Sequence, residues 1–64
     1  MDIELIIKHF GNQKKLADLL GVSHVAVVQW KRRGLPPKQA IRIERITKGY
    51  FRARDIVGAK SVDK

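Results

Sequence analysis

Residues 24–32, HVAVVQWKR, combine hydrogen-bonding side chains with small apolar ones at helical spacing. Gln29 can form two hydrogen bonds with adenine, and Arg32 can form two with guanine or contact a phosphate. Val25 and Val28 are small enough to pack on the methyl group of thymine. The major groove of DNA displays the matching donors, acceptors and methyl groups, so the stretch predicts base reading.

A helix of about 100° per residue divides this stretch into two faces. Ala26, Val27 and Trp30 gather on one side, which we expect to be buried, with Trp30 a core residue rather than one that stacks on bases. The other side spans about 140° of arc and holds His24, Val25, Val28, Gln29 and Arg32. The alternative is that the exposed valines contact another helix or a partner protein.

Apolar residues that recur every three or four positions predict helices around this stretch. Gly11, Gly21 and Gly34 separate the helices, and Asn12 and Ser23 are good N-caps. The first expected helix has Ile3, Ile6, Ile7 and Phe10 on its buried side, and the second covers Gln13–Leu20 with Leu16, Ala17, Leu19 and Leu20 inward. The third runs from His24 to Arg32 or Arg33. The fourth runs from Pro37 to about Gly49 with Ala40, Ile43 and Ile46 inward.

The part of the chain after Tyr50 allows two interpretations. We favour a short fifth helix, Ala53 to Val57, that packs Phe51, Ile56 and Val57 on the core, but the β-forming composition also permits a strand. The predicted fold is therefore an all-α helix-turn-helix domain of four to five helices, with an α+β domain ending in a β-hairpin as the alternative. Residues 1–58 form this domain, and residues 59–64 form a flexible tail.

Charge and composition narrow the function further. Fourteen Lys and Arg against six Asp and Glu give a formal net charge of +8, which favours a polyanionic partner over a merely solvated surface. The chain has no cysteine, which suits a reducing compartment, and no apolar run near the roughly 20 residues of a membrane span. We therefore expect a soluble, cytoplasmic protein.

Catalytic and metal-binding patterns are not apparent in the sequence. His9 and His24 lack companions at ligand spacing, and no nucleophile is paired with a base. Asp18 and Glu44 are expected to pair with neighbouring lysines or arginines. We therefore predict no enzyme activity, no metal, no cofactor and no small-molecule substrate.

The stretch QKKLADLLGVSHVAVVQWKR, residues 13–32, resembles the helix-turn-helix of the phage Cro repressor family and related YdaS-type DNA-binding proteins. In that family an alanine lies in the first motif helix, a glycine opens the turn four residues later, and a β-branched residue follows six residues beyond. Here these are Ala17, Gly21 and Val27. HFGNQ and AIRIERITKG resemble the flanking helices, so the resemblance covers about residues 4–50.

The resemblance implies a lambda-repressor-like domain in which specific side chains contact DNA. Those facing the bases would be His24, Val25, Val28, Gln29 and Arg32. Many relatives have a small polar residue where this chain has Val28, which cannot hydrogen-bond to a base. Those near the sugar-phosphate backbone would be Gln13, Lys14 and Ser23, and position and charge add Lys31, Arg33 and Lys38.

The predicted partner is double-stranded operator DNA in a bacterial cell that carries the phage or prophage. One helix reads only a few base pairs, so we expect a weak, DNA-assisted homodimer on an inverted repeat. Its candidate interface residues are Tyr50, Phe51, Ile56 and Val57. Repression is implied by the resemblance. The alternative function is an antitoxin-like module whose exposed valines and C-terminal apolar residues bind a protein.

Overall fold

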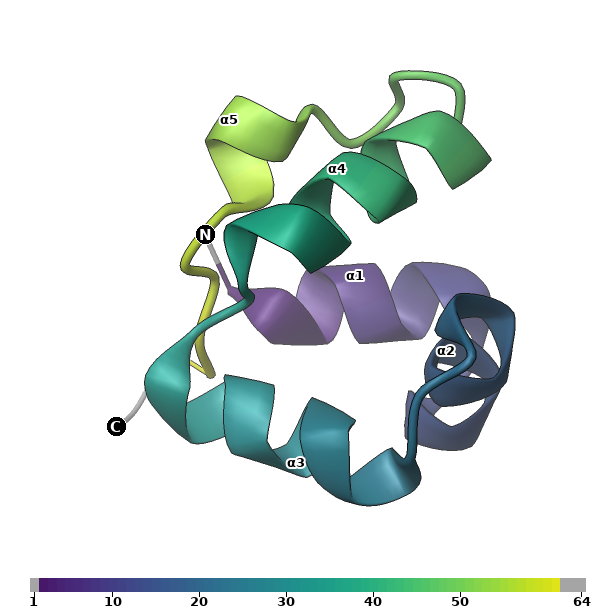
Figure 1. Cartoon of the computed structure of the whole chain (residues 1–64), viewed down its shortest axis with the longest axis vertical. Helices are drawn as coiled ribbons and strands as arrows, with labels where there is room; N and C mark the ends of the chain where they lie inside the picture. Colours follow the sequence, from purple (N-terminus) through teal and green to yellow (C-terminus); the bar gives the residue numbers. More distant parts are fainter. Residues whose placement is uncertain (1, 62–64) are drawn as a thin grey trace.

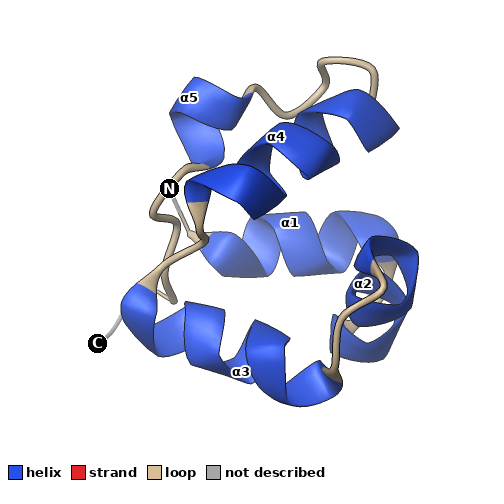
Figure 2. Ribbon diagram, viewed as in Figure 1, coloured by secondary structure: helices blue, strands red, loops and turns tan. Residues whose placement is uncertain are grey.

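The computed structural model describes residues 2–61, and within this range the chain forms five helices joined by short turns (Figure 1). The helices are α1 (Ile3–Phe10), α2 (Gln13–Leu20), α3 (His24–Arg33), α4 (Pro37–Ile46) and α5 (Ala53–Ile56). Residues 2–61 contain no strand beyond an isolated bridge between Asp2 and Lys60 (Figure 2). The all-α prediction is therefore confirmed, and the β-hairpin alternative is wrong.

The turn between α2 and α3 is built by the residues that the sequence marks for it. Gly21 has the left-handed conformation (φ 68°, ψ 31°), and its N–H donates to the carbonyls of Ala17 and Asp18. The Ser23 hydroxyl then accepts from the Ala26 N–H at 3.3 Å and caps α3. Only residues 21–23 separate the two helices, so α3 begins at His24 as predicted.

α4 ends at Ile46 rather than near Gly49, because Lys48 and Gly49 have positive φ angles of 53° and 87°, which do not occur in a right-handed helix. The Thr47 hydroxyl donates to the Ile43 carbonyl at 2.8 Å and accepts from the Phe51 N–H at 3.2 Å. This hydroxyl links the end of α4 to the segment leading into α5. Ile46 lies to one side of the buried row of α4 and is exposed, so its predicted inward position is wrong.

α5 ends at Ile56, one residue before the predicted end. The Glu44 carboxylate accepts the Ala53 N–H at 2.7 Å, so a side chain of α4 satisfies an N–H at the start of α5. Glu44 was expected to pair with a neighbouring basic residue, and it serves as a remote cap instead. This bond and the packing of Ile56 hold a helix that is too short to be stable alone.

One apolar core joins all five helices and contains no buried polar side chain among the described residues. Trp30 and Val27 lie in it, as predicted. Leu19 does not, because Leu16, Ala17 and Leu20 form the buried row of α2 and Leu19 lies to one side of that row, exposed. The buried residues are Ile3, Ile6, Ile7, Leu16, Ala17, Leu20, Val27, Trp30, Leu35, Ala40, Ile43, Phe51, Ile56 and Ala59.

The segment after α5 returns along the molecule and touches the start of α1 and the end of α3, as the yellow trace in Figure 1 shows. Its backbone bonds pair Gly58 and Ala59 with Leu35 and join the Ile3 N–H to the Lys60 carbonyl at 2.9 Å. Ala59 is buried. The predicted flexible tail therefore begins too early, because residues 59–61 are hydrogen-bonded to the domain; residues 62–64 lie outside the described range.

We predict that Gly34→Ala destabilises the domain more than Gly21→Ala. A Cβ at Gly34 would lie 2.9 Å from the Gly58 carbonyl oxygen, and φ there is 104°, whereas a Cβ at Gly21 meets nothing within 4 Å. Urea denaturation should give a loss of about 3 kcal/mol for Gly34→Ala, from strain plus the clash, and about 1 kcal/mol for Gly21→Ala, from strain alone. Equal losses would contradict the close approach of the two segments.

Candidate nucleic-acid interface

The outer side of α3 exposes the five side chains predicted to contact bases. Val25 is 60% exposed and Val28 is 39% exposed, while Val27 and Trp30 on the opposite side are buried. His24, Gln29 and Arg32 are also exposed. We call this surface the reading face and define it as His24, Val25, Val28, Gln29 and Arg32. It presents two valines and three hydrogen-bonding groups along one helix.

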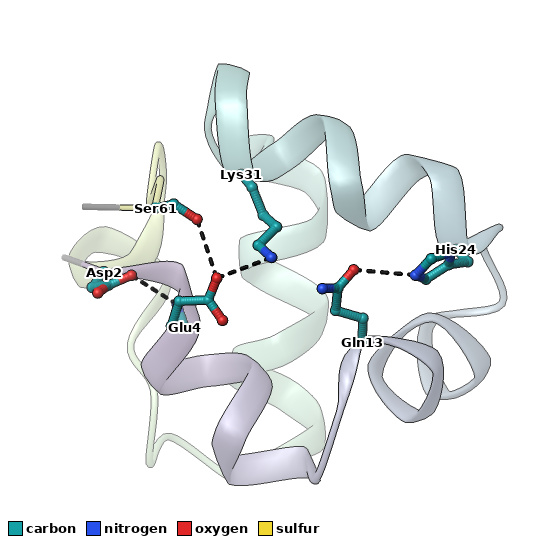
Figure 3. Close-up of polar contacts among 6 residues, drawn as sticks. All are labelled: Asp2, Glu4, Gln13, His24, Lys31 and Ser61. Atoms are coloured by element: carbon teal, nitrogen blue, oxygen red, sulfur yellow. Dashed lines mark hydrogen bonds and ion pairs between the residues drawn. The ribbon is translucent and has the colours of Figure 1, made fainter. Parts of the chain in front are cut away.

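The first residues of α2 and α3 are joined by a side-chain hydrogen bond. Nε2 of His24 lies 3.1 Å from Oε1 of Gln13, as the dashed line in Figure 3 shows. Gln13 is half-buried, and its amide oxygen is a partner for the exposed imidazole. The bond brings together two residues that the sequence assigns to different contacts and sets the direction of the imidazole at one end of the reading face.

The start of α2 lies beside that end of the reading face. Asn12 caps α2 by accepting the Lys15 N–H at 2.9 Å, and Lys14 is exposed next to the cap. The first backbone N–H groups of a helix lack helical acceptors and carry the positive end of the helix dipole. An anion can therefore be accommodated at the start of α2 with Lys14 nearby.

The remaining predicted backbone contacts differ in their surroundings. Arg33 and Lys38 are exposed, at the end of α3 and the start of α4. Lys31 is different, since its Nζ lies 3.0 Å from a Glu4 carboxylate oxygen and its side chain is 27% exposed. Within residues 2–61 this is the one ion pair, so Lys31 differs from Arg33 and Lys38 in having an acidic partner on the domain.

The predicted dimer residues do not form a single patch. Phe51 and Ile56 lie in the core, so their assignment to an interface is wrong for this conformation. Tyr50 is 71% exposed and stacks on His9 with ring centroids 4.9 Å apart. Val57 is 45% exposed and lines an apolar groove between α4 and α5 with Ile41. The two exposed residues thus belong to separate surfaces.

Two features of this interface were missed by sequence reasoning. Lys31 forms an ion pair with Glu4 of α1, which lies far away in the sequence. No local sequence pattern predicts this pair. Ile41 is exposed on α4, and helical spacing alone does not show which apolar residues of a helix stay outside the core.

Residues 2–61 contain no group of three His, Cys, Asp or Glu side chains able to hold a metal, and no helix there is long and apolar enough to cross a membrane.

A turn of three residues between two packed helices, the second with one exposed side, is the arrangement of the helix-turn-helix class of DNA-binding proteins. A family model described as "DNA-binding transcriptional regulator Cro" matches residues 2–62, and the chain belongs to this family of DNA-binding transcriptional regulators. The regulatory protein cro of Salmonella phage P22 is 42% identical over 50 residues, which cover 78% of this chain and 80% of that protein. No solved structure matches the chain. The resemblance predicted from residues 13–32 is therefore confirmed.

Proposed function

We propose that the protein binds operator DNA sequence-specifically through α3 in the major groove and represses transcription by occupying promoter sites. The observation that carries this proposal is the reading face, where two exposed valines lie among hydrogen-bonding groups on a chain of net charge +8. A solvated helix surface gains nothing from exposed valines, whereas thymine methyl groups give them an apolar partner. Binding of this kind takes place on the bacterial nucleoid.

Each side chain of the reading face has a proposed role in the groove. Gln29 pairs with adenine, and Arg32 pairs with guanine or a neighbouring phosphate. Val25 and Val28 pack on thymine methyl groups. His24 bonds a base or a phosphate, with its ring direction set by the bond to Gln13.

The proposed backbone contacts surround this face. Gln13 and Lys14 approach a phosphate at the start of α2, where the backbone N–H groups also point. The Ser23 oxygen already accepts the Ala26 N–H, which leaves its hydroxyl hydrogen able to donate to a phosphate. Arg33 and Lys38 are exposed cations that contact the flanking backbone.

The proposed binding unit is a weak homodimer assisted by DNA. One recognition helix reads only a few base pairs, and two copies on an inverted repeat lie about one helical turn apart. Of the predicted contact residues, Tyr50 and Val57 remain available at the surface. Val57 is the better candidate, because the groove it shares with Ile41 is apolar and Tyr50 is already stacked on His9.

Selection of bound sequences from random duplex DNA tests the proposal directly. We expect an enriched half-site repeated as an inverted repeat, with thymines among the specified positions. Recovery of no enriched sequence at physiological salt would contradict sequence-specific binding. A tight stoichiometric protein partner retained at high salt would then support the antitoxin-like alternative. Since Phe51 and Ile56 are buried, the exposed residues among the apolar contacts predicted for it are Val25, Val28, Tyr50 and Val57.

Substitutions on the reading face and at the start of α2 should have different effects. Gln29→Ala and Arg32→Ala should each reduce discrimination between the selected duplex and a random duplex by about 1–3 kcal/mol, since each removes a base contact. Lys14→Ala should weaken both duplexes alike and reduce the salt slope by about 0.9. Binding titrations over a salt series measure both quantities. Equal losses on the two duplexes for Gln29→Ala and Arg32→Ala would rule out base reading.

Thymine methyl recognition can be tested on the DNA itself. Replacing a thymine that faces Val28 by uracil removes the methyl group and keeps every hydrogen-bonding group. Affinity should fall about fourfold, because a buried methyl contributes about 0.8 kcal/mol. The Val28→Ala variant is the matched control and should bind the thymine and uracil duplexes equally. A variant that still prefers thymine would show that Val28 does not contact that methyl group.

A further inference from the structure

Three segments of the chain meet at one carboxylate oxygen near the end of α3. Oε2 of Glu4 receives Nζ of Lys31 at 3.0 Å and Oγ of Ser61 at 3.2 Å (Figure 3). The Ser61 N–H donates to the Lys31 carbonyl at 3.1 Å and closes the ring of contacts. We call these three residues, Glu4, Lys31 and Ser61, the Glu4 clasp. It joins α1, α3 and the C-terminal segment.

The carboxylate of the clasp is itself held in place. Oδ1 of Asp2 caps α1 by accepting the Glu4 N–H at 2.9 Å. The next N–H toward the N-terminus, that of Ile3, donates to the Lys60 carbonyl beside Ser61. The backbone of Glu4 is thus hydrogen-bonded on one side of the clasp and that of Ser61 on the other, so backbone bonds hold the two ends of the clasp beside each other.

Lys31 lies at the border of the reading face. It follows His24 by seven residues, which places it about 20° from His24 around α3. Its neighbour Arg32 belongs to the reading face. An unheld ammonium at this border, on a flexible stem of four carbons, could reach the phosphates beside the groove.

We propose that Glu4 withholds Lys31 from the DNA backbone and uses it to fix the last turn of α3, which makes Glu4 a positioning residue for base reading. The inference rests on the proposed DNA-binding function. A phosphate contact from Lys31 would strengthen binding to every sequence equally. A fixed last turn instead fixes the direction of Arg32, which favours the correct base over others. The clasp therefore lowers the affinity for all DNA sequences and raises the preference for the correct one.

The test compares Glu4→Gln with Asp55→Asn, a matched variant that also removes one negative charge. Asp55 is exposed on α5 and has no ion-pair partner within residues 2–61. Both variants are titrated with the selected duplex and with a random duplex over a salt series. Thermal unfolding by circular dichroism checks that each variant is folded.

Glu4→Gln should release Lys31. The salt slope should then steepen by about 0.9 on both duplexes, which corresponds to one added phosphate contact. The ratio of selected to random affinity should fall about two- to fivefold, the range that a half-exposed ion pair supports. Asp55→Asn should change neither the slope nor the ratio by a comparable amount.

Two further variants assign the effect to the clasp. Adding Lys31→Met to Glu4→Gln should return the slope to that of the unaltered chain, because the released ammonium is then gone. Ser61→Ala keeps every charge, so it should lower the affinity ratio without steepening the slope, and it provides the test if Glu4→Gln does not fold.

The titrations distinguish a failure of the role proposed for Glu4 from a failure of the proposed DNA-binding function. If the unaltered chain binds the selected duplex but Glu4→Gln behaves as Asp55→Asn does, or the double variant keeps a steep slope, the role of Glu4 is overturned alone. If the unaltered chain binds neither duplex, the proposed function fails and the inference fails with it.

Discussion

The burial of one side of α3 is the constraint on which the rest of the structure depends. Val27 and Trp30 insert into the core, and this insertion decides which residues of α3 remain outside. A rotation of α3 by one residue position would expose the tryptophan and bury polar groups, at a cost that a core of this size cannot absorb. The orientation of the exposed side chains of α3 is thus a consequence of hydrophobic packing.

Local signals in the sequence were sufficient for most of the helical framework. Asn12, Gly21 and Ser23 act through neighbours three or four residues away, so their bonds can be predicted from residue types alone. The division of α3 into buried and exposed faces also follows from helical spacing, because the buried residues recur every three or four positions. The residues of the reading face were accordingly found exposed where the sequence placed them.

The predictions failed where distant segments determine the outcome. Glu44 caps a helix nine residues along the chain, and Val57, which was expected to pack on the core, is 45% exposed. The burial of Phe51 and Ile56, by contrast, agrees with the expected packing of the fifth helix on the core. Lys31 is paired with Glu4 from α1, a contact that the sequence did not indicate. Contacts of this kind depend on the tertiary structure, and the spacing and types of residues in the sequence do not predict them.

The C-terminal segment also has a consequence for the order of folding during synthesis. The hydrogen bond from Ser61 to Glu4 spans 57 positions, and Leu35 and Ile3 likewise bond to residues beyond α5. Residues 58–61 leave the ribosome after all five helices, and contacts between such distant residues form late because the loop they close is long. A nascent chain can therefore carry a formed helix-turn-helix while the end of α3 still lacks its contacts with the C-terminal segment.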